Sequence, residues 1–118
     1  MGLHHELPIY KAAYELLGMA TEITRNIPRD LKAGLGATVR DECIKVIVLV
    51  ARANSTPNKV PHLVEMVERV QVVEFLLRIF KDKHFISVKQ HASAMQITAS
   101  IGKQANGWKK KSATSPAA

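Results

Sequence analysis

The pattern of apolar and polar positions divides the chain into four segments with helical periodicity. In each segment apolar residues recur at steps of three and four, which is the spacing of one face of an α-helix. Stretches rich in polar residues separate the segments at residues 26–30, 54–61 and 81–87, and the first two also contain prolines. We therefore expect helices over about Ile9–Arg25, Arg29–Asn54 and Lys59–Lys83. A fourth should begin at Ser87 and continue until the pattern breaks at Gly107.

The same periodicity predicts which side chains face the core. The expected stripes are Tyr10, Ala13, Leu17, Ala20, Thr24 and Ile27; Leu63, Val67, Val70, Val73, Leu77 and Phe80; and Ala94, Ile97, Ile101, Ala105 and Trp108. Because the linkers are short, consecutive helices should lie antiparallel. The predicted fold class is therefore all-α, an up-down-up-down four-helix bundle over residues 1–110. Residues 111–118 are expected to form a disordered tail.

The second and third helices are more apolar than a bundle of this size requires. The stretch Cys43–Ala53 is apolar on nearly every side, and the third helix carries apolar residues off its main stripe. One interpretation is a well-buried central pair within a monomer. The other is a subunit interface, which we favour because a small bundle buries no helix completely. The expected interface residues are Ile44, Val48, Val64, Val72 and Phe75.

Length and composition indicate one globular domain. The 118 residues are 47% hydrophobic and include a single cysteine, Cys43, so no internal disulfide can form. The first ten residues lack a signal-peptide pattern, and the apolar run Ile44–Ala51 is too short to cross a bilayer. We expect a soluble cytoplasmic protein.

Positive charge is concentrated at the C-terminal end. Residues 1–82 hold 11 Lys and Arg against 10 Asp and Glu, whereas residues 83–118 hold six lysines and no acidic residue. Such asymmetry favours a polyanionic partner such as nucleic acid. A solubilising tail and an anionic membrane surface are the alternatives.

Catalytic, metal and cofactor motifs are missing from the sequence. The five histidines form no known metal spacing, and neither a phosphate-binding glycine loop nor a nucleophile elbow occurs. Cys43 lies among apolar neighbours and is expected to be a small buried hydrophobe. We therefore expect no catalytic residue, no metal site and no cofactor, and do not expect an enzyme.

Several motifs, in order and spacing, resemble the accessory variability determinant (Avd) proteins of diversity-generating retroelements, within a wider superfamily of four-helix-bundle proteins. The matching stretches are LPIYKAAYELL (7–17), NIPRDLKAGLGATV (26–39), ARAN (51–54), NKVPHLVEMVERVQVVEFLLRIFKDKHFIS (58–87) and KQHASAMQITASIGKQANGWKK (89–110). The resemblance covers about residues 7–110. Its most specific parts are the terminal GWKK and the IPR turn.

The resemblance implies a non-catalytic subunit that forms a ring-shaped homopentamer. It also implies binding to the retroelement's reverse transcriptase and to nucleic acid, notably the template RNA, in support of mutagenic retrohoming. The alternative is a four-helix interaction protein of the kind encoded in intervening sequences of ribosomal RNA genes, without a polymerase partner. Membrane binding is disfavoured because the fourth helix needs its apolar stripe inside the bundle.

The candidate nucleic-acid residues are basic side chains on helices, in turns and at the C-terminal end. They are Arg29, Arg40, Arg52, Arg69, Arg78, Lys89, Lys103, Lys109, Lys110 and Lys111. Trp108 continues the apolar stripe of the fourth helix, so we expect it to close the end of the bundle. Stacking on a nucleobase is the alternative role for this side chain.

Overall fold

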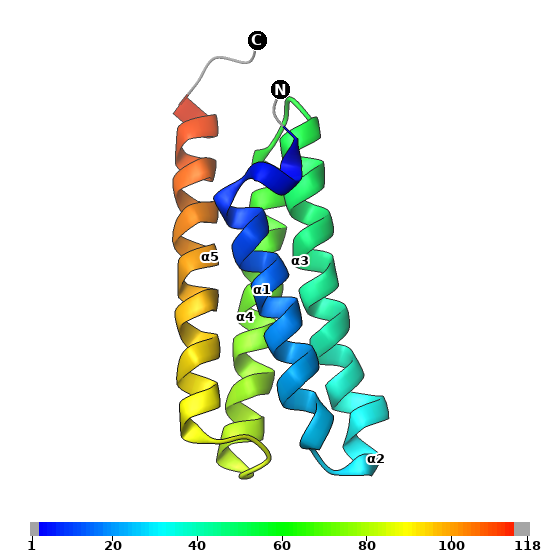
Figure 1. Ribbon diagram of the computed structural model, residues 1–118. Helices are drawn as coiled ribbons and strands as arrows, with labels where there is room; N and C mark the ends of the chain where they lie inside the picture. Colours follow the sequence, from blue (N-terminus) through cyan, green and yellow to red (C-terminus); the bar gives the residue numbers. More distant parts are fainter. Residues whose placement is uncertain (1–2, 115–118) are drawn as a thin grey trace.

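The structure is a computed structural model that describes residues 3–114, and every regular element in that range is helical (Figure 1). The α-helices are α1 (Pro8–Ile23), α2 (Arg29–Leu31), α3 (Ala37–Ser55), α4 (Val60–Asp82) and α5 (Val88–Thr114). Short 3-10 turns cover His4–Glu6 and Thr24–Asn26. The predicted all-helical fold is therefore confirmed.

The four long helices run antiparallel to one another in chain order (Figure 1). α1 packs against α3 and α5, and α4 also packs against α3 and α5, so the helices occupy the corners of a square. A single chain forms an elongated bundle of 50 × 21 × 20 Å. α3 and α5 end where α1 and α4 begin, which brings residues distant in sequence to the same end of the bundle.

Local sequence signals explain where the helices start. Pro8 begins α1, where its missing N–H leaves no hydrogen bond unmade, and Pro61 lies in the first turn of α4. At the start of α5 the Ser87 N–H donates to Oε1 of Gln90 at 2.8 Å, and the Gln90 N–H donates to Oγ of Ser87 at 3.0 Å. These two bonds form a capping box.

The segment expected as one continuous second helix is interrupted. Between α2 and α3 the residues Lys32–Gly36 form a π-helical turn, which inserts extra backbone into the helix. Gly36 is buried there, and a Cβ at this position would lie 3.1 Å from Cδ1 of Ile27. Gly34 is exposed with open space around its Cα, so of these two glycines only Gly36 makes a close contact.

The buried core follows the predicted stripes with local shifts. Tyr10, Leu17 and Val67 were expected inside but are only partly buried, while neighbouring side chains take the central positions. The residues that replace them are Ile9, Leu16 and Met66. A helix that contacts two neighbours buries a broad face, so a stripe drawn with strict three-and-four spacing can miss adjacent positions.

α5 does not end at Gly107 but continues through it to Thr114. The helical structure therefore extends past the expected domain boundary between residues 110 and 111. A glycine in a helix costs only about 1 kcal/mol relative to alanine. Packing of Trp108 against the core offsets part of that cost. Residues 115–118 of the expected tail lie outside the described residues.

Candidate nucleic-acid interface

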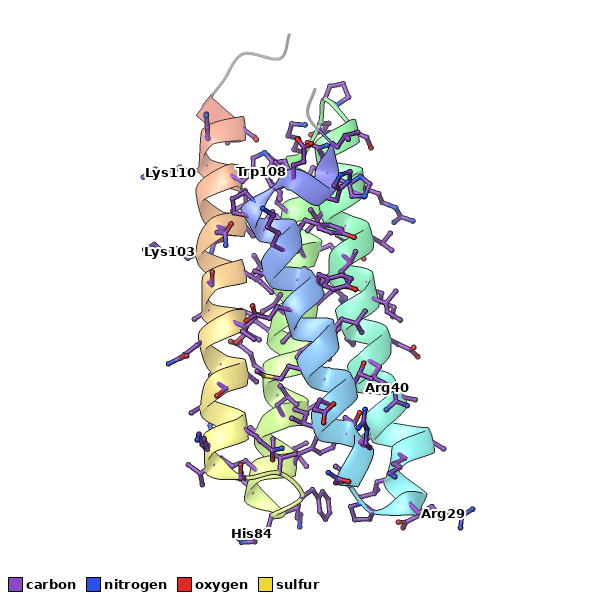
Figure 2. All side chains as sticks on the ribbon, in the orientation of Figure 1. Arg29, Arg40, His84, Lys103, Trp108 and Lys110 are labelled. Carbon is purple, nitrogen blue, oxygen red and sulfur yellow. The ribbon has the colours of Figure 1, made fainter. Side chains whose placement is uncertain are left out.

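The last third of α5 carries a concentrated positive charge. Lys103 and Lys110 are exposed and point outward from the same face of the helix, seven residues apart (Figure 2). Seven residues make about two helical turns, so the two ammonium groups belong to one row. Lys109 is partly buried and Lys111 is exposed. α5 contains no acidic residue to offset these charges.

Two basic residues from other elements lie at the same end of the bundle. Arg52 is exposed in the last turn of α3, and Lys59 directly precedes α4. We call the set Arg52, Lys59, Lys103, Lys109, Lys110 and Lys111 the basic end. Lys59 was not among the predicted site residues. Its position two residues before Pro61, at the start of a predicted helix, was the sequence signal for it.

Lys59, at the start of α4, contacts both the C-terminal end of α3 and Trp108 of α5. Its Nζ donates to the carbonyl oxygens of Ala53 at 2.7 Å and Thr56 at 2.8 Å, at the C-terminal end of α3. The same ammonium lies 5.8 Å from the centre of the Trp108 ring, a cation–π geometry. Trp108 is partly buried and packs against the core. This network fixes where α5 and its lysines stand relative to α3.

Arg40 and Arg69 have partners inside the bundle. Nη1 of Arg40 donates to Oγ1 of Thr24 at 2.9 Å, and its Nη2 donates to the Lys32 carbonyl at 3.3 Å. Nη1 of Arg69 is 3.1 Å from a carboxylate oxygen of the buried Glu42. Both guanidinium groups are partly buried. These contacts hold both guanidinium groups against the bundle. We therefore do not include Arg40 and Arg69 in the basic end.

The remaining predicted residues lie at the opposite end of the bundle. Arg29 is exposed next to the α1–α2 turn (Figure 2), and Arg78 is 3.9 Å from Asp82 in the last turns of α4. Lys89, at the start of α5, lines a shallow pocket with Glu22 of α1. The bundle is 50 Å long, so the structure does not bring these residues together with the basic end.

His91, in the first turn of α5 near this opposite end, has a perturbed environment. The pKa of His91 is lowered from its ordinary value, first by burial and then by the charge of Lys81. Its Nε2 is buried and has no hydrogen-bond partner among the described residues. Burial and the Lys81 charge both disfavour the charged form of the His91 imidazole. The turn before it contains His84 in a left-handed conformation with φ of 61°.

Among the described residues, four of the seven exposed large apolar side chains lie on α3 and α4, and the other three are Leu3, Tyr14 and Val88. Ile44 is 47% exposed and Val48 40% on α3, while on α4 Val64 is 40% exposed and Phe75 67%. Val72 is only partly buried. We call these five residues the apolar face. α3 and α4 are adjacent, and Glu42 contacts Arg69 across them, so antiparallel packing places Val48 close to the level of Val64.

The described residues contain no group of three or more His, Cys, Asp or Glu placed to hold a metal ion. Burial raises the pKa of the Cys43 thiol to about 12, with the Glu42 charge as a smaller cause. A thiol with that pKa is not a nucleophile at neutral pH. Within residues 3–114, no helix combines the length and the apolar character that crossing a membrane requires.

The fold and the basic end define a class: a basic four-helix protein with an uncovered apolar face. Residues 8–112 match the family model described as bAvd-like, and the chain belongs to this family. The resemblance to the accessory variability determinant proteins is therefore confirmed. Proteins of this kind are accessory and non-catalytic. No curated protein matched the chain.

Proposed function

We propose that this protein is a non-catalytic accessory subunit of a diversity-generating retroelement that binds nucleic acid through its basic end. The bAvd-like match over residues 8–112 is the observation that carries the proposal. The polymerase of the element would supply the chemistry. This subunit would bind that reverse transcriptase and the template RNA or its cDNA, and support mutagenic retrohoming.

The distribution of charge supports nucleic acid as the ligand. Exposed Lys103 and Lys110 form one row on α5, and Arg52 adds a guanidinium from α3. Lysine attracts phosphate as a point charge, and arginine can contact it with two parallel hydrogen bonds. Binding of this kind follows charge rather than sequence and releases condensed counterions. Recognition of a particular template would then depend on RNA shape and on the polymerase.

The apolar face supports self-association. Phe75 is 67% exposed, and Ile44, Val48 and Val64 on the same two helices are 40–47% exposed, so a monomer would leave this apolar surface in contact with water. We propose that a second copy of the chain covers this face and that the assembly is a homopentameric ring. A ring would repeat the basic end five times and multiply its local field.

The first test is a salt titration of the purified protein with a structured RNA, followed by fluorescence anisotropy. We expect log affinity to fall linearly with log salt, with a slope of roughly −0.7 to −0.9 per phosphate contacted. The second step adds the reverse transcriptase of the same retroelement and measures co-elution by size-exclusion chromatography. Absence of RNA binding at low salt, together with absence of co-elution, would reject the proposal in favour of a four-helix interaction protein without a polymerase partner.

A further inference from the structure

A surface pocket of about 320 Å³ lies between the start of α1 and the last turns of α5. This volume is at the lower end of the range for small-molecule sites. α1 and the residue before it contribute apolar side chains, and α5 contributes an aromatic ring, an amide and an ammonium group. The lining residues are Leu7, Pro8, Ile9, Gln104, Gly107, Trp108 and Lys111.

Gly107 accounts for part of the open space. A Cβ added at this position would meet no atom within 4 Å, so no neighbouring side chain covers the helix surface there. Gly107 is one of the residues that line the pocket, so a bulky side chain at this position is a direct test of that space. Its neighbour Trp108 is held in place by packing against the core and by Lys59 over the ring. The pocket therefore combines free volume with an aromatic group of fixed position.

We propose that this pocket holds one unpaired base of a single-stranded nucleic acid, stacked against Trp108. The inference rests on the proposed function, and it adds a specific contact to binding by charge alone. Aromatic side chains bind bases of any identity because every base offers a π-face. The side-chain amide of Gln104, whose Nε2 donates to Oγ of Ser100 at 3.0 Å, can both accept from and donate to a base edge.

The charge around the pocket favours a nucleotide over an apolar segment of another protein. No carboxylate lines the pocket, and Lys111 lines it directly. Lys110 and Lys103 stand on the outward side of the same helix, α5, which lacks acidic residues. A base seated against Trp108 would place its own phosphate near Lys111, which lines the pocket. An apolar peptide would gain nothing from these ammonium groups.

The sole tryptophan of the chain makes the contact measurable. Stacking of a base on Trp108 should quench its fluorescence. The probe is a single-stranded oligonucleotide, and its matched control is an abasic oligonucleotide with the same number of phosphates. We expect quenching by the first and not by the second, and binding of the first to be about tenfold tighter at equal salt.

Two pairs of variants distinguish the loss of base binding in the pocket from a loss of folding. Trp108→Phe should retain the preference for the base-containing oligonucleotide, measured by anisotropy, and Trp108→Leu should lose it. Gly107→Leu should fill the pocket and abolish the preference. Its control is Gly102→Leu, which enters open space on the same helix and does not line the pocket. Circular dichroism should report an unchanged helical content for all four variants.

The possible outcomes distinguish this inference from the proposed function. Equal, salt-dependent binding of both oligonucleotides would overturn the base pocket and leave the proposed function intact. Failure of both to bind at low salt would overturn both. If Gly107→Leu weakened only the complex with the reverse transcriptase, the pocket would hold a protein segment, and the inference would be wrong.

Discussion

Both carboxylate oxygens of Glu42 on α3 accept hydrogen bonds from Nη1 of Arg69 on α4, at 3.2 and 3.1 Å. The Glu42 side chain is only 8% exposed, and Lys45 approaches it at 3.4 Å from the solvent side. This ion pair joins the two helices that carry the apolar face. It also fixes their register along the bundle.

Removing Arg69 alone should destabilise the protein because it leaves a buried carboxylate without its main partner. We expect Arg69→Met to lower the free energy of unfolding by roughly 2–3 kcal/mol. This is below the usual cost of breaking a buried pair because the arginine side chain is 28% exposed. Urea denaturation measures the change. The double variant Glu42→Leu/Arg69→Met should recover most of the lost free energy of unfolding, because it no longer contains the buried carboxylate. If the double variant were as unstable as Arg69→Met, the unpaired carboxylate would not be the cause of the loss.

Replacing Lys109, Lys110 and Lys111 together with alanine should weaken nucleic-acid binding and flatten its salt dependence. The expected reduction in slope is up to about three per chain, since each phosphate contact releases roughly one counterion. Anisotropy measures affinity, and circular dichroism should report unchanged helicity. The matched control replaces Lys11, Arg25 and Lys83, three exposed basic residues outside the basic end, and so removes the same charge elsewhere on the bundle. If both triple variants weakened nucleic-acid binding equally, the affinity would depend on net charge and not on the basic end.

Val48→Glu should split the oligomer that we propose. The residue is 40% exposed in the protomer, so the variant should fold normally. A second copy over the apolar face would bury the new carboxylate without a partner, at a cost of several kcal/mol. Light scattering after size-exclusion chromatography measures the mass. The control is Val88→Glu, which is 75% exposed at the start of α5 and away from the apolar face. A Val48→Glu variant with the mass of the wild-type oligomer would remove this face from the interface.

The two glycines of the π-helical turn should respond differently to alanine. Gly34→Ala adds a methyl group into open space, and we expect a gain of about 0.5–1 kcal/mol from reduced backbone freedom. Gly36→Ala brings the methyl to 3.1 Å from Ile27 and 3.4 Å from Arg40, so this gain should be cancelled or reversed. Thermal unfolding of the two variants is the measurement. Equal midpoints would show that the contact with Ile27 relaxes freely.

Much of the helical architecture could be predicted from the sequence because it depends on local signals. The prolines near the starts of α1 and α4 and the Ser87–Gln90 capping box act within a single turn of chain. The apolar period also identified most core residues, including Ala13, Val70 and Ile101. Where it failed, as at Tyr10, the buried neighbour was one residue away.

The candidate site could be predicted only in part, because sequence position does not reveal side-chain partners. Arg40, Arg69 and Arg52 are similar as basic helix residues in the sequence. Only packing of the helices places the first against Thr24 and the second against Glu42, while the third remains exposed. Lys59 was missed because its partners, the Ala53 carbonyl and the Trp108 ring, come from two other elements.

The sequence by itself determined four helical segments, an excess of positive charge after residue 82 and a surplus of apolar residues on the second and third helices. These properties follow from the order of residues and from the helical period. The tertiary structure decided which cations are exposed, which apolar side chains remain uncovered, and that a pocket forms between α1 and α5. Those features depend on distances between helices, and the distances are set by side chains that meet only after the chain has folded.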